Sequence, residues 1–272
     1  MIFDLDGVIY RGDVPVPGAV ELVGQLHDAG VLVRFATNNS LVTRADYVRA
    51  LAAMGIPSVE SEIVTSNTAT VLFLERHATA LRSVLAVGER GLLTELEAAG
   101  YDVTPAATVA PDAATGAPLR TGYDAVVAGL DRGFDYGRLA AATSAIRGGA
   151  RFIATNADAR YPTPAGFLPG AGSMVSAISA ASGTTPEVIG KPAPAMLLAI
   201  VEEAGLEVGD ALMVGDNPDA DVVAARRAGI RSVLVLTGVA EPNGVAALAG
   251  ERRPDVVVDG PLDVARLLGL VS

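Results

Sequence analysis

Short apolar runs rich in Val and Ile alternate along the chain with longer segments of helical period. This alternation is typical of strands and crossover helices in a parallel sheet. In the two terminal parts of the chain, strands are expected at 1–4, 31–36, 63–65, 211–214, 232–236 and 256–258. Helices are expected at 17–29, at 44–54, after residue 65 as far as residue 76, and at 219–228. The pattern therefore predicts an α/β protein with a parallel sheet.

A second alternating set lies between these two parts. Its expected strands are 83–87, 124–128 and 152–155, and its expected helices are 90–99 and 136–147. The Ala, Pro and Thr-rich segment 104–122 is interpreted as a surface excursion or a short edge element. We expect a core domain formed by 1–78 and 186–272, with an inserted domain at 79–185; both are of ordinary domain size.

Asparagine marks the ends of several expected strands. The chain has six, and five directly follow strand-like runs: Asn38, Asn39, Asn67, Asn156 and Asn217. Ligands of open α/β sheets bind at the carboxyl ends of strands, so these positions indicate a site. Asparagine also suits loops and helix caps, which is the interpretation we prefer for Asn67.

Composition restricts the classes of partner. The net charge of −11 opposes attraction to nucleic acid or to an anionic membrane, and with 4% aromatic residues and no Trp a base-stacking platform is not expected. No apolar run approaches the roughly 18 residues of a membrane-spanning helix. Because neither a basic stretch nor an apolar leader precedes Ile2, we expect a cytoplasmic protein. The absence of Cys excludes thiolate metal ligands, so a metal would need oxygen ligands, His27 or His77.

Asp4 and Asp6 stand two residues apart at the end of the first expected strand. The period of a strand then points both carboxylates to one side, and Gly7 permits a sharp turn of the backbone. Two such charges repel each other and need a cation or a shared proton. Mg²⁺ fits because it bridges carboxylates to phosphate oxygens. The alternative is a pair of solvated carboxylates at the end of a loop.

Two further strand ends carry chemically useful groups. Thr37 and Asn38 offer a hydroxyl and consecutive backbone N–H groups before a helix, which suits phosphate oxygens but is also an ordinary turn. Asp216 ends another strand, and Asp221 lies in the first turn of the following helix. Asp219 is interpreted as an acid that favours the helix N-terminus.

Lys191 is the single lysine among twenty basic side chains, and it follows the apolar run 186–189. A compact ammonium suits a small tetrahedral anion better than the planar fork of Arg does. Taken alone, the position could equally reflect a drift in composition toward Arg. It becomes informative beside the acidic pair at the start of the chain.

Jointly, these strand ends resemble the four motifs of the haloacid dehalogenase (HAD) superfamily: Asp4-Leu5-Asp6-Gly7, Thr37, Lys191 and Asp216 to Asp221. Longer phrases look like its subclass IIA, the 4-nitrophenylphosphatase-like and NagD-like phosphatases: 4–10, 36–40, 129–132, 169–173 and 189–192. The resemblance covers nearly the whole chain. It implies a Rossmann-like doubly wound parallel sheet core, the HAD fold, with an inserted α/β cap domain between the second and third motifs.

The resemblance also implies a Mg²⁺-dependent phosphatase that acts on a small phosphate monoester through an aspartyl-phosphate. Asp4 would attack phosphorus, and Asp6 would protonate the leaving alcohol and then activate water. The other implied roles are Mg²⁺ binding by Asp4, the Asp6 carbonyl and Asp216 with support from Asp221, and phosphate binding by Thr37, the Asn38 backbone and Lys191. Nothing in the sequence selects one ester, although the scarcity of aromatic residues slightly favours a small aliphatic phosphate.

Residues of the cap are the candidates for substrate contact. Arg160 and Tyr161 are expected to touch the leaving group, with Asp158 and Arg132 shaping the loop, and Asn156 is a further candidate for substrate specificity. A solvated loop with Tyr161 packed on the cap is the equal alternative. Caps of this subclass often mediate dimers, so a homodimer through the cap is expected.

Other classes of function remain to be weighed. A non-catalytic phosphate-binding or scaffold protein that retains the fold is expected to have lost Asp4, Asp6, Lys191 or Asp216, and all four are present. A dinucleotide-binding oxidoreductase lacks the Gly-x-Gly-x-x-Gly phrase after the first strand. Asp6 argues against a dehalogenase.

Overall fold

A computed structural model describes residues 1–109, 121–163 and 166–270, together with all their side chains except those of 161–163. The chain divides into two compact units. The first unit comprises Met1–Thr37, Arg44–Thr65 and Lys191–Ser272, and the second comprises Asn38–Thr43 and Ser66–Gly190. Among the described residues, no helix is both long and apolar enough to cross a membrane.

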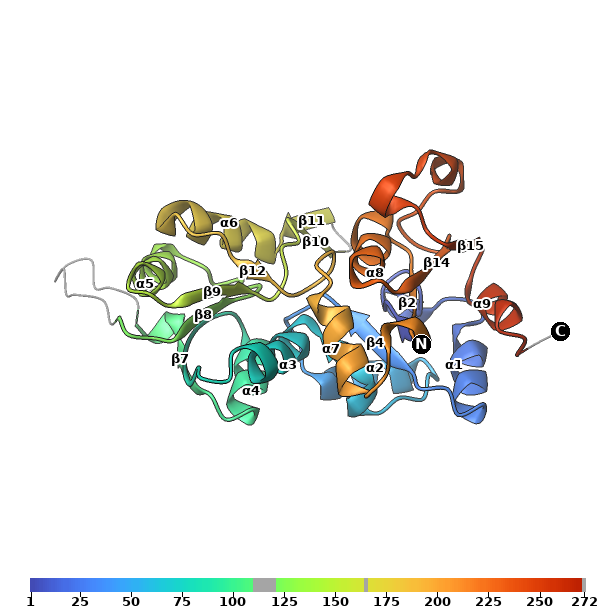
Figure 1. The fold of residues 1–272 in the computed structure, drawn as a ribbon, viewed down its shortest axis with the longest axis horizontal. Coiled ribbons are helices and arrows are strands. Elements are labelled where there is room, and N and C mark those ends of the chain that lie inside the picture. The colour runs from blue at the N-terminus through green and yellow to red at the C-terminus, as the bar shows by residue number, and fades with distance from the viewer. Residues whose placement is uncertain (110–120, 164–165, 271–272) are drawn as a thin grey trace. The chain divides into compact units, whose positions relative to one another are not determined.

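The first unit contains a six-stranded sheet in the order β15-β14-β13-β1-β4-β5, with every pair parallel. Figure 1 labels β4, β14 and β15 of this sheet. Its strands are β1 (Ile2–Phe3), β4 (Arg34–Thr37), β5 (Ile63–Thr65), β13 (Leu212–Gly215), β14 (Arg231–Val235) and β15 (Val256–Val258). The chain order reverses at β1, so right-handed crossovers place helices on both faces of this sheet.

Four of the helices described in the first unit pack in two pairs, whereas α2 (Arg44–Ala53) contacts β5. The four are α1 (Ala19–Asp28), α7 (Ala195–Glu203), α8 (Val223–Ala228) and α9 (Pro261–Leu267). Helix α1 packs against α9, and α7 packs against α8. Shorter pieces are the 3₁₀ turns Glu60–Glu62, Val208–Asp210, Pro242–Ala247 and Gly250–Arg252 and the π-helical turn Pro218–Val222.

Burial explains why β1 can be central although it is short. Ile2 and Phe3 are both buried, as are all four residues of β4, which is the pattern of a parallel strand covered on both faces. Phe3 pairs with Phe35 on one side and with Val214 on the other. The residues that follow β1, β4 and β13 therefore emerge at the same edge of the sheet.

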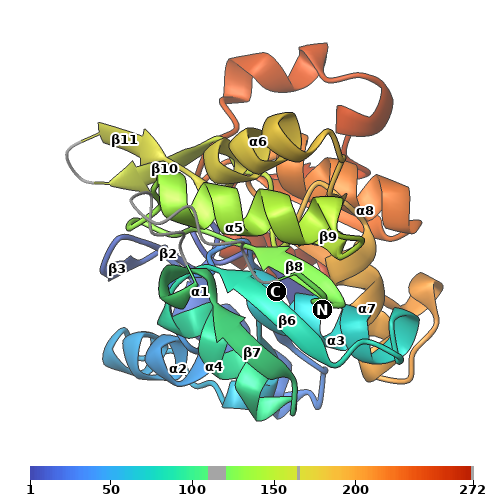
Figure 2. The same cartoon turned by 90° about the vertical axis from the view of Figure 1, so that its left-hand side faces the viewer.

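The second unit contains a five-stranded parallel sheet in the order β12-β9-β8-β6-β7. Its strands are β6 (Ser83–Val87), β7 (Asp102–Pro105), β8 (Ala125–Ala128), β9 (Arg151–Ala154) and β12 (Glu187–Val188). Its helices are α3 (Ser66–His77), α4 (Arg90–Ala98), α5 (Tyr136–Arg147) and α6 (Ala171–Ser182), with a 3₁₀ turn at Ala106–Thr108. Figure 2 shows α5 and α6 on one face of this sheet and α3 and α4 on the other.

Two antiparallel hairpins complete the fold. One pairs β2 (Tyr10–Arg11) with β3 (Val14–Pro15) in the first unit. The other pairs β10 (Arg160–Thr163) with β11 (Gly166–Pro169) in the second unit. Both hairpins carry residues close in sequence to the predicted site.

The parallel α/β architecture and the elements expected from the hydrophobic pattern are confirmed; some end points are as expected and most others differ by one to three residues. Two details add to the expectations from the sequence. The run before Lys191 forms β12, which pairs with β9 in the second sheet, whereas the sequence placed it in the core. The expected helix 219–228 begins as the π-helical turn Pro218–Val222. The predicted domain boundaries after 78 and 185 differ from the divisions between the units and stay a prediction.

Candidate active site

Three of the predicted site residues lie at the carboxyl ends of neighbouring strands in the first unit. Asp4 follows β1, Thr37 ends β4 and Asp216 follows β13. The backbone N–H of Asp4 donates to the Val214 carbonyl at 2.9 Å, which continues the β1 to β13 ladder into the site. The reversal of strand order at β1 is where ligands bind in open α/β sheets.

Lys191 joins two of the acids. Its Nζ donates to Asp4 Oδ1 at 2.5 Å, to Asp221 Oδ1 at 2.7 Å and to the Ala36 carbonyl at 3.0 Å. Only 3% of the Lys191 side chain is exposed. All three protons of the ammonium therefore have an oxygen acceptor, and the side chain is held in one place.

Asp221 is held by the π-helical turn Pro218–Val222. Its Oδ1 accepts from Lys191, and its Oδ2 accepts from the Asn217 backbone N–H at 3.1 Å. A π turn widens the helix and often marks a functional position. Because both oxygens have protein partners, Asp221 supports Lys191 directly.

Asp216 is fixed by the loop after β14. Its Oδ2 accepts from the Val239 backbone N–H at 2.6 Å, and the residue is buried. The backbones of Gly238 and Gly7 come so close to this carboxylate that a Cβ on either residue would overlap it. Glycine at these two positions is therefore required for the observed place of Asp216.

The three acids form one group. Carboxylate oxygens of Asp4, Asp216 and Asp221 all lie within 4.8 Å of one another. Burial raises the pKa of Asp216 to about 6, and Asp221 adds to the shift. Burial also raises the pKa of Asp4 well above its usual range, against the attraction of Lys191. One ammonium does not balance three carboxylates, so the site favours a further positive charge.

For the pKa of Lys191, the charges of its neighbours outweigh the effect of burial. Burial lowers the pKa of its ammonium, but the carboxylates of Asp221 and Asp4 outweigh burial and raise the pKa above its ordinary value. Lys191 is therefore a permanently charged group at neutral pH. Asp221, with 2% of its side chain exposed, is stabilised by it.

Asp6 lies outside this group. Its side chain is exposed, and its backbone forms a bridge to Tyr10 at the start of the β2–β3 hairpin. Gly7 follows in the left-handed region with φ of 82°, and its N–H donates to the Tyr10 carbonyl at 2.8 Å. Partial burial raises the pKa of Asp6. The strand period predicted that both carboxylates would face one volume, but this turn separates Asp6 from the three-acid group.

The segment Asn38–Thr43, directly after Thr37, belongs to the second unit. Side chains of that unit hold Asn38 in place. The Asn38 carbonyl accepts from Asn156 Nδ2 at 2.7 Å and from Ser66 Oγ at 2.8 Å. The Asn38 side chain donates to Asp158 Oδ2 at 3.0 Å. The sequence-predicted Asn38, Asn156 and Asp158 are thus brought together.

Arg132 and Arg160 contact other residues of the second unit. Arg132 makes a bidentate ion pair with Glu89, with both nitrogen to oxygen distances at 2.7 Å, and this pair lowers the pKa of Glu89. Arg160 lies over the Phe167 ring, 5.4 Å from its centroid. Tyr161 belongs to β10, and its side chain lies outside the described part of the chain.

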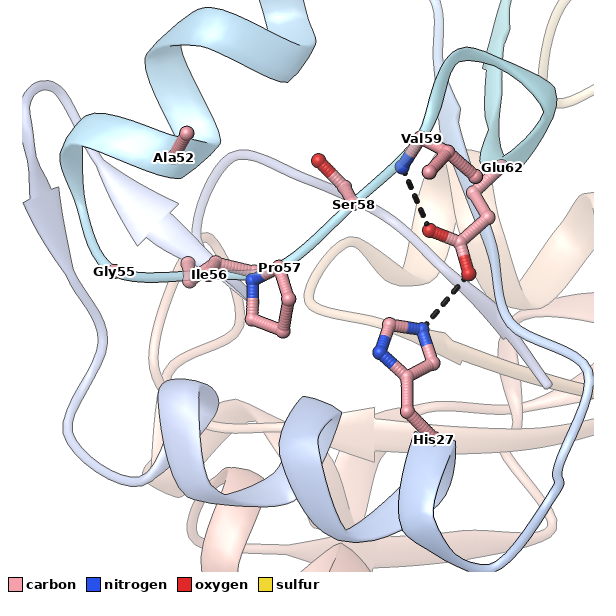
Figure 3. Close-up of a pocket in the computed structure, with 8 residues that line it drawn as sticks. All are labelled: His27, Ala52, Gly55, Ile56, Pro57, Ser58, Val59 and Glu62. Carbon is pink, nitrogen blue, oxygen red and sulfur yellow. Dashed lines mark hydrogen bonds and ion pairs between the residues drawn. The ribbon is translucent and has the colours of Figure 1, made fainter.

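A pocket of about 740 Å³ in the first unit contains none of the predicted site residues (Figure 3). It lies near the C-termini of α1 and α2 and before β5, at the amino ends of the strands, whereas the acids lie at the carboxyl ends. His27 Nε2 and Glu62 Oε1 are 2.8 Å apart in it, and Glu62 Oε2 accepts from the Val59 N–H at 3.0 Å. These contacts fasten the connection between α2 and β5 to α1.

Comparisons with known proteins agree with this geometry. Residues 1–102 match the haloacid dehalogenase-like hydrolase family, and residues 188–264 match a second HAD-hydrolase-like family. The acid sugar phosphatase of Staphylococcus epidermidis is 36% identical over 239 residues, which are 88% of this chain and 86% of that protein. The chain belongs to the HAD hydrolases.

Solved structures of this HAD family define the subclass. The 4-nitrophenylphosphatase of Thermotoga maritima has 33% identity and a TM-score of 0.84 over 97% of this chain and 95% of its own. The glycerol phosphate phosphatase of Mycobacterium tuberculosis, solved in complex with magnesium, has 33% identity and a TM-score of 0.82 over 97% of this chain and 75% of its own. The expected subclass IIA, the HAD fold and a phosphatase activity are confirmed.

Several contributors to the site escaped the sequence interpretation. They are the Ala36 carbonyl, the Val239 N–H and the glycines at 215 and 238. The phrase Thr237-Gly238-Val239 lies one residue after the buried strand β14, close to a strand end as the other site phrases are. This position close to a strand end is the signal by which the sequence could have identified Gly238 and Val239.

Proposed function

We propose that this HAD phosphatase hydrolyses small phosphate monoesters with Mg²⁺, through a phosphoryl group carried on Asp4. The observation that carries the proposal is the buried Lys191 bridging Asp4 and Asp221 beside Asp216. An ammonium and a carboxylate at 2.5 Å present a charged nucleophile together with the positive charge that a phosphate dianion needs.

The donor set fits Mg²⁺. It consists of hard carboxylate oxygens with an excess of negative charge and no Cys or His, and the Gly238 backbone leaves room for the Asp216 carboxylate. Asp4, Asp216 and the Asp6 carbonyl would hold the ion, with Asp221 in support. When bound, the ion neutralises charge on the carboxylates and on the phosphoryl oxygens.

The side chains then have separate roles. Asp4 attacks phosphorus while Lys191 restrains its carboxylate. Asp6 is exposed with a raised pKa, as a group that passes a proton to a leaving alcohol and takes one from water needs to be. Thr37 Oγ1 and the Asn38 N–H hold the phosphoryl oxygens, and Lys191 binds the phosphoryl group through its positive charge.

The substrate class follows from the chemistry of the site and from the relatives. The names of two relatives given above refer to sugar phosphates and to glycerol phosphate. We favour a small aliphatic phosphate monoester, with Arg160 and Tyr161 at its leaving group. The homodimer through the cap and the cytoplasmic location remain predictions.

Phosphate release from a panel of monoesters tests the proposed function. The panel should contain a sugar phosphate, glycerol phosphate, a nucleoside monophosphate and 4-nitrophenyl phosphate, each assayed with Mg²⁺ and with EDTA. We expect release with Mg²⁺ and a loss of at least about 10²-fold with EDTA, because the acids repel the phosphate when no cation balances them. Bound phosphate without any turnover would instead support the non-catalytic alternative.

Replacing Gly238 by Ala is expected to weaken Mg²⁺ binding. The new Cβ overlaps the Asp216 carboxylate, which must move from its place. We expect the Mg²⁺ concentration for half-maximal activity to rise at least about tenfold, since a displaced ligand costs metal affinity. Magnesium titrations of activity measure this.

Gly244→Ala is the matched control for that variant. Nothing lies within 4 Å of a Cβ at this position, which is in the exposed turn Pro242–Ala247. Its Mg²⁺ dependence should equal that of the unmodified chain. An equal Mg²⁺ requirement in Gly238→Ala would contradict the role of Asp216 as a ligand.

A further inference from the structure

Asn156 lies beside three of the points at which the chain enters or leaves the second unit. The chain passes from one unit to the other at 37/38, 43/44, 65/66 and 190/191. The second-unit residues of three of these passages are Asn38, Ser66 and Gly190. Each contacts Asn156 or its neighbour Thr155, as the following distances show.

The hydrogen bonds converge on one carbonyl. Asn156 Nδ2 donates to the Asn38 carbonyl at 2.7 Å, and Ser66 Oγ donates to the same oxygen at 2.8 Å. The separation of Asn156 Nδ2 and Ser66 Oγ is 3.5 Å. A peptide carbonyl that accepts two side-chain donors has little freedom to rotate.

The second connection is fastened at the same place. The Gly190 N–H donates to the Thr155 carbonyl at 2.8 Å. A Cβ built on Gly190 would lie 2.6 Å from Asn38 Oδ1 and 2.8 Å from Asn156 Cβ, closer than real Cβ atoms approach. Gly190 and Asn38 therefore pass each other in direct contact at Asn156.

The polar atoms of Asn156 are used inside the unit. Its Oδ1 accepts from the Asp158 N–H at 3.1 Å, and the residue is 3% exposed. A side chain buried in this way cannot also read the leaving group of a substrate. These contacts favour a role of Asn156 inside the second unit and give no support to the specificity role expected from the sequence.

We propose that Asn156 is a positioning residue for phosphoryl transfer, acting through the two chain connections that it fastens. Asn38 directly follows Thr37, and Gly190 directly precedes Lys191, so both phosphate-binding residues are one peptide away from the fastened points. The proposal rests on the proposed phosphatase function. In this proposal Asn156, shortly after the end of β9, keeps Thr37 and Lys191 in the positions that bind phosphate.

Loss of the Asn156 contacts should slow the reaction at the phosphoryl group without changing the selectivity between esters. All phosphate esters share this group, so a loosened connection slows each of them by the same factor. Misplacement of binding groups by about 1 Å can cost up to about 10²-fold in rate. A residue in contact with the leaving group would change the relative rates of different esters instead.

Asn156→Asp tests this proposal. The variant keeps the Oδ1 acceptor for the Asp158 N–H but replaces the donor to Asn38 by an oxygen. We expect kcat to fall at least about tenfold, the inhibition constant of inorganic phosphate to rise, and the ratios of activity across the ester panel to stay constant. The half-maximal Mg²⁺ concentration should not change, since the three acids are untouched. Steady-state kinetics and phosphate inhibition measure all four.

Asn243→Asp is the matched control, because it makes the same chemical change at an exposed turn. Its kinetics should equal those of the unmodified chain. Unchanged kcat and phosphate inhibition in Asn156→Asp would overturn the proposal, and so would altered ratios between esters. A chain that releases no phosphate before any substitution would refute the proposed function itself, which separates the two failures.

Ser66→Ala keeps the test decisive if Asn156→Asp does not fold. Ser66 donates to the same carbonyl, so its loss should lower kcat for all esters by one common factor, and wild-type kinetics would overturn the proposal. Where both variants fold, the double variant should lose less than the product of the two single losses, because they share one acceptor. Independent, multiplying effects would contradict a shared anchor.

Discussion

Asp4→Asn is expected to abolish phosphate release while leaving the fold intact. The amide keeps the shape of the side chain but is a far weaker nucleophile, so kcat should fall by at least about 10³-fold. The half-buried carboxylate lies beside two other acids, and its pKa is raised by burial. Removal of its charge therefore relieves repulsion, and the metal-free protein should not lose thermal stability.

Rate measurements and thermal unfolding check the two halves of this expectation. Asp28→Asn is the control, since this exposed residue at the end of α1 is far from the carboxyl ends of the strands and loses the same charge. Acid quenching during turnover should trap phosphate on the unmodified chain and none on Asp4→Asn. Full activity of this variant would refute the covalent role of Asp4 and leave the family assignment untouched.

The parallel α/β architecture could be predicted because its strands are short apolar runs with clear polar boundaries. Ser83–Val87, Tyr136–Arg147 and Val256–Val258 were expected with the bounds that they have. Helices α6 and α7 were not assigned. Their residues are mostly small or apolar, so no polar face of helical period distinguishes them from their surroundings.

The pairing of a strand with its neighbour is harder to predict from the sequence than the position of the strand along the chain. Glu187–Val188 is two residues long and has nothing in its sequence to favour one sheet over the other. Its pairing with β9 is decided by the N–H of Ile189, which donates to the Ala154 carbonyl at 3.0 Å, and by that of Gly190, which donates to Thr155. Such contacts between distant segments leave no periodic signal.

The types of residue in the candidate site could be predicted from the sequence, but the contacts between them could not. Asp4, Asp216 and Lys191 were selected by residue type at strand ends, and the structure brings them together with Asp221. That Lys191 reaches Asp221 depends on the π-helical turn, which the pattern presented as an ordinary helix. The burial of Asn156 against Asn38 depends on three separate segments, so the sequence indicated only that a polar group follows β9.

Lys191→Arg is expected to lose at least about 10²-fold in kcat although it conserves the charge. The ammonium donates to three oxygens between 2.5 and 3.0 Å away in a space where only 3% of the side chain is exposed. A guanidinium is longer and planar, and forcing it into this space displaces its neighbours at a cost of about 1–3 kcal/mol. Both Asp4 and Asp221 would have to shift.

Lys191→Met separates charge from shape in the same position. This side chain has a similar length, but it leaves Asp221 buried without its cation, so Lys191→Met should unfold at a lower temperature than Lys191→Arg and have no activity. Kinetics and thermal unfolding of both variants measure the difference. If Lys191→Arg worked as well as the unmodified chain, a positive charge alone would suffice there, and the selection of the one lysine among nineteen arginines would have no catalytic cause.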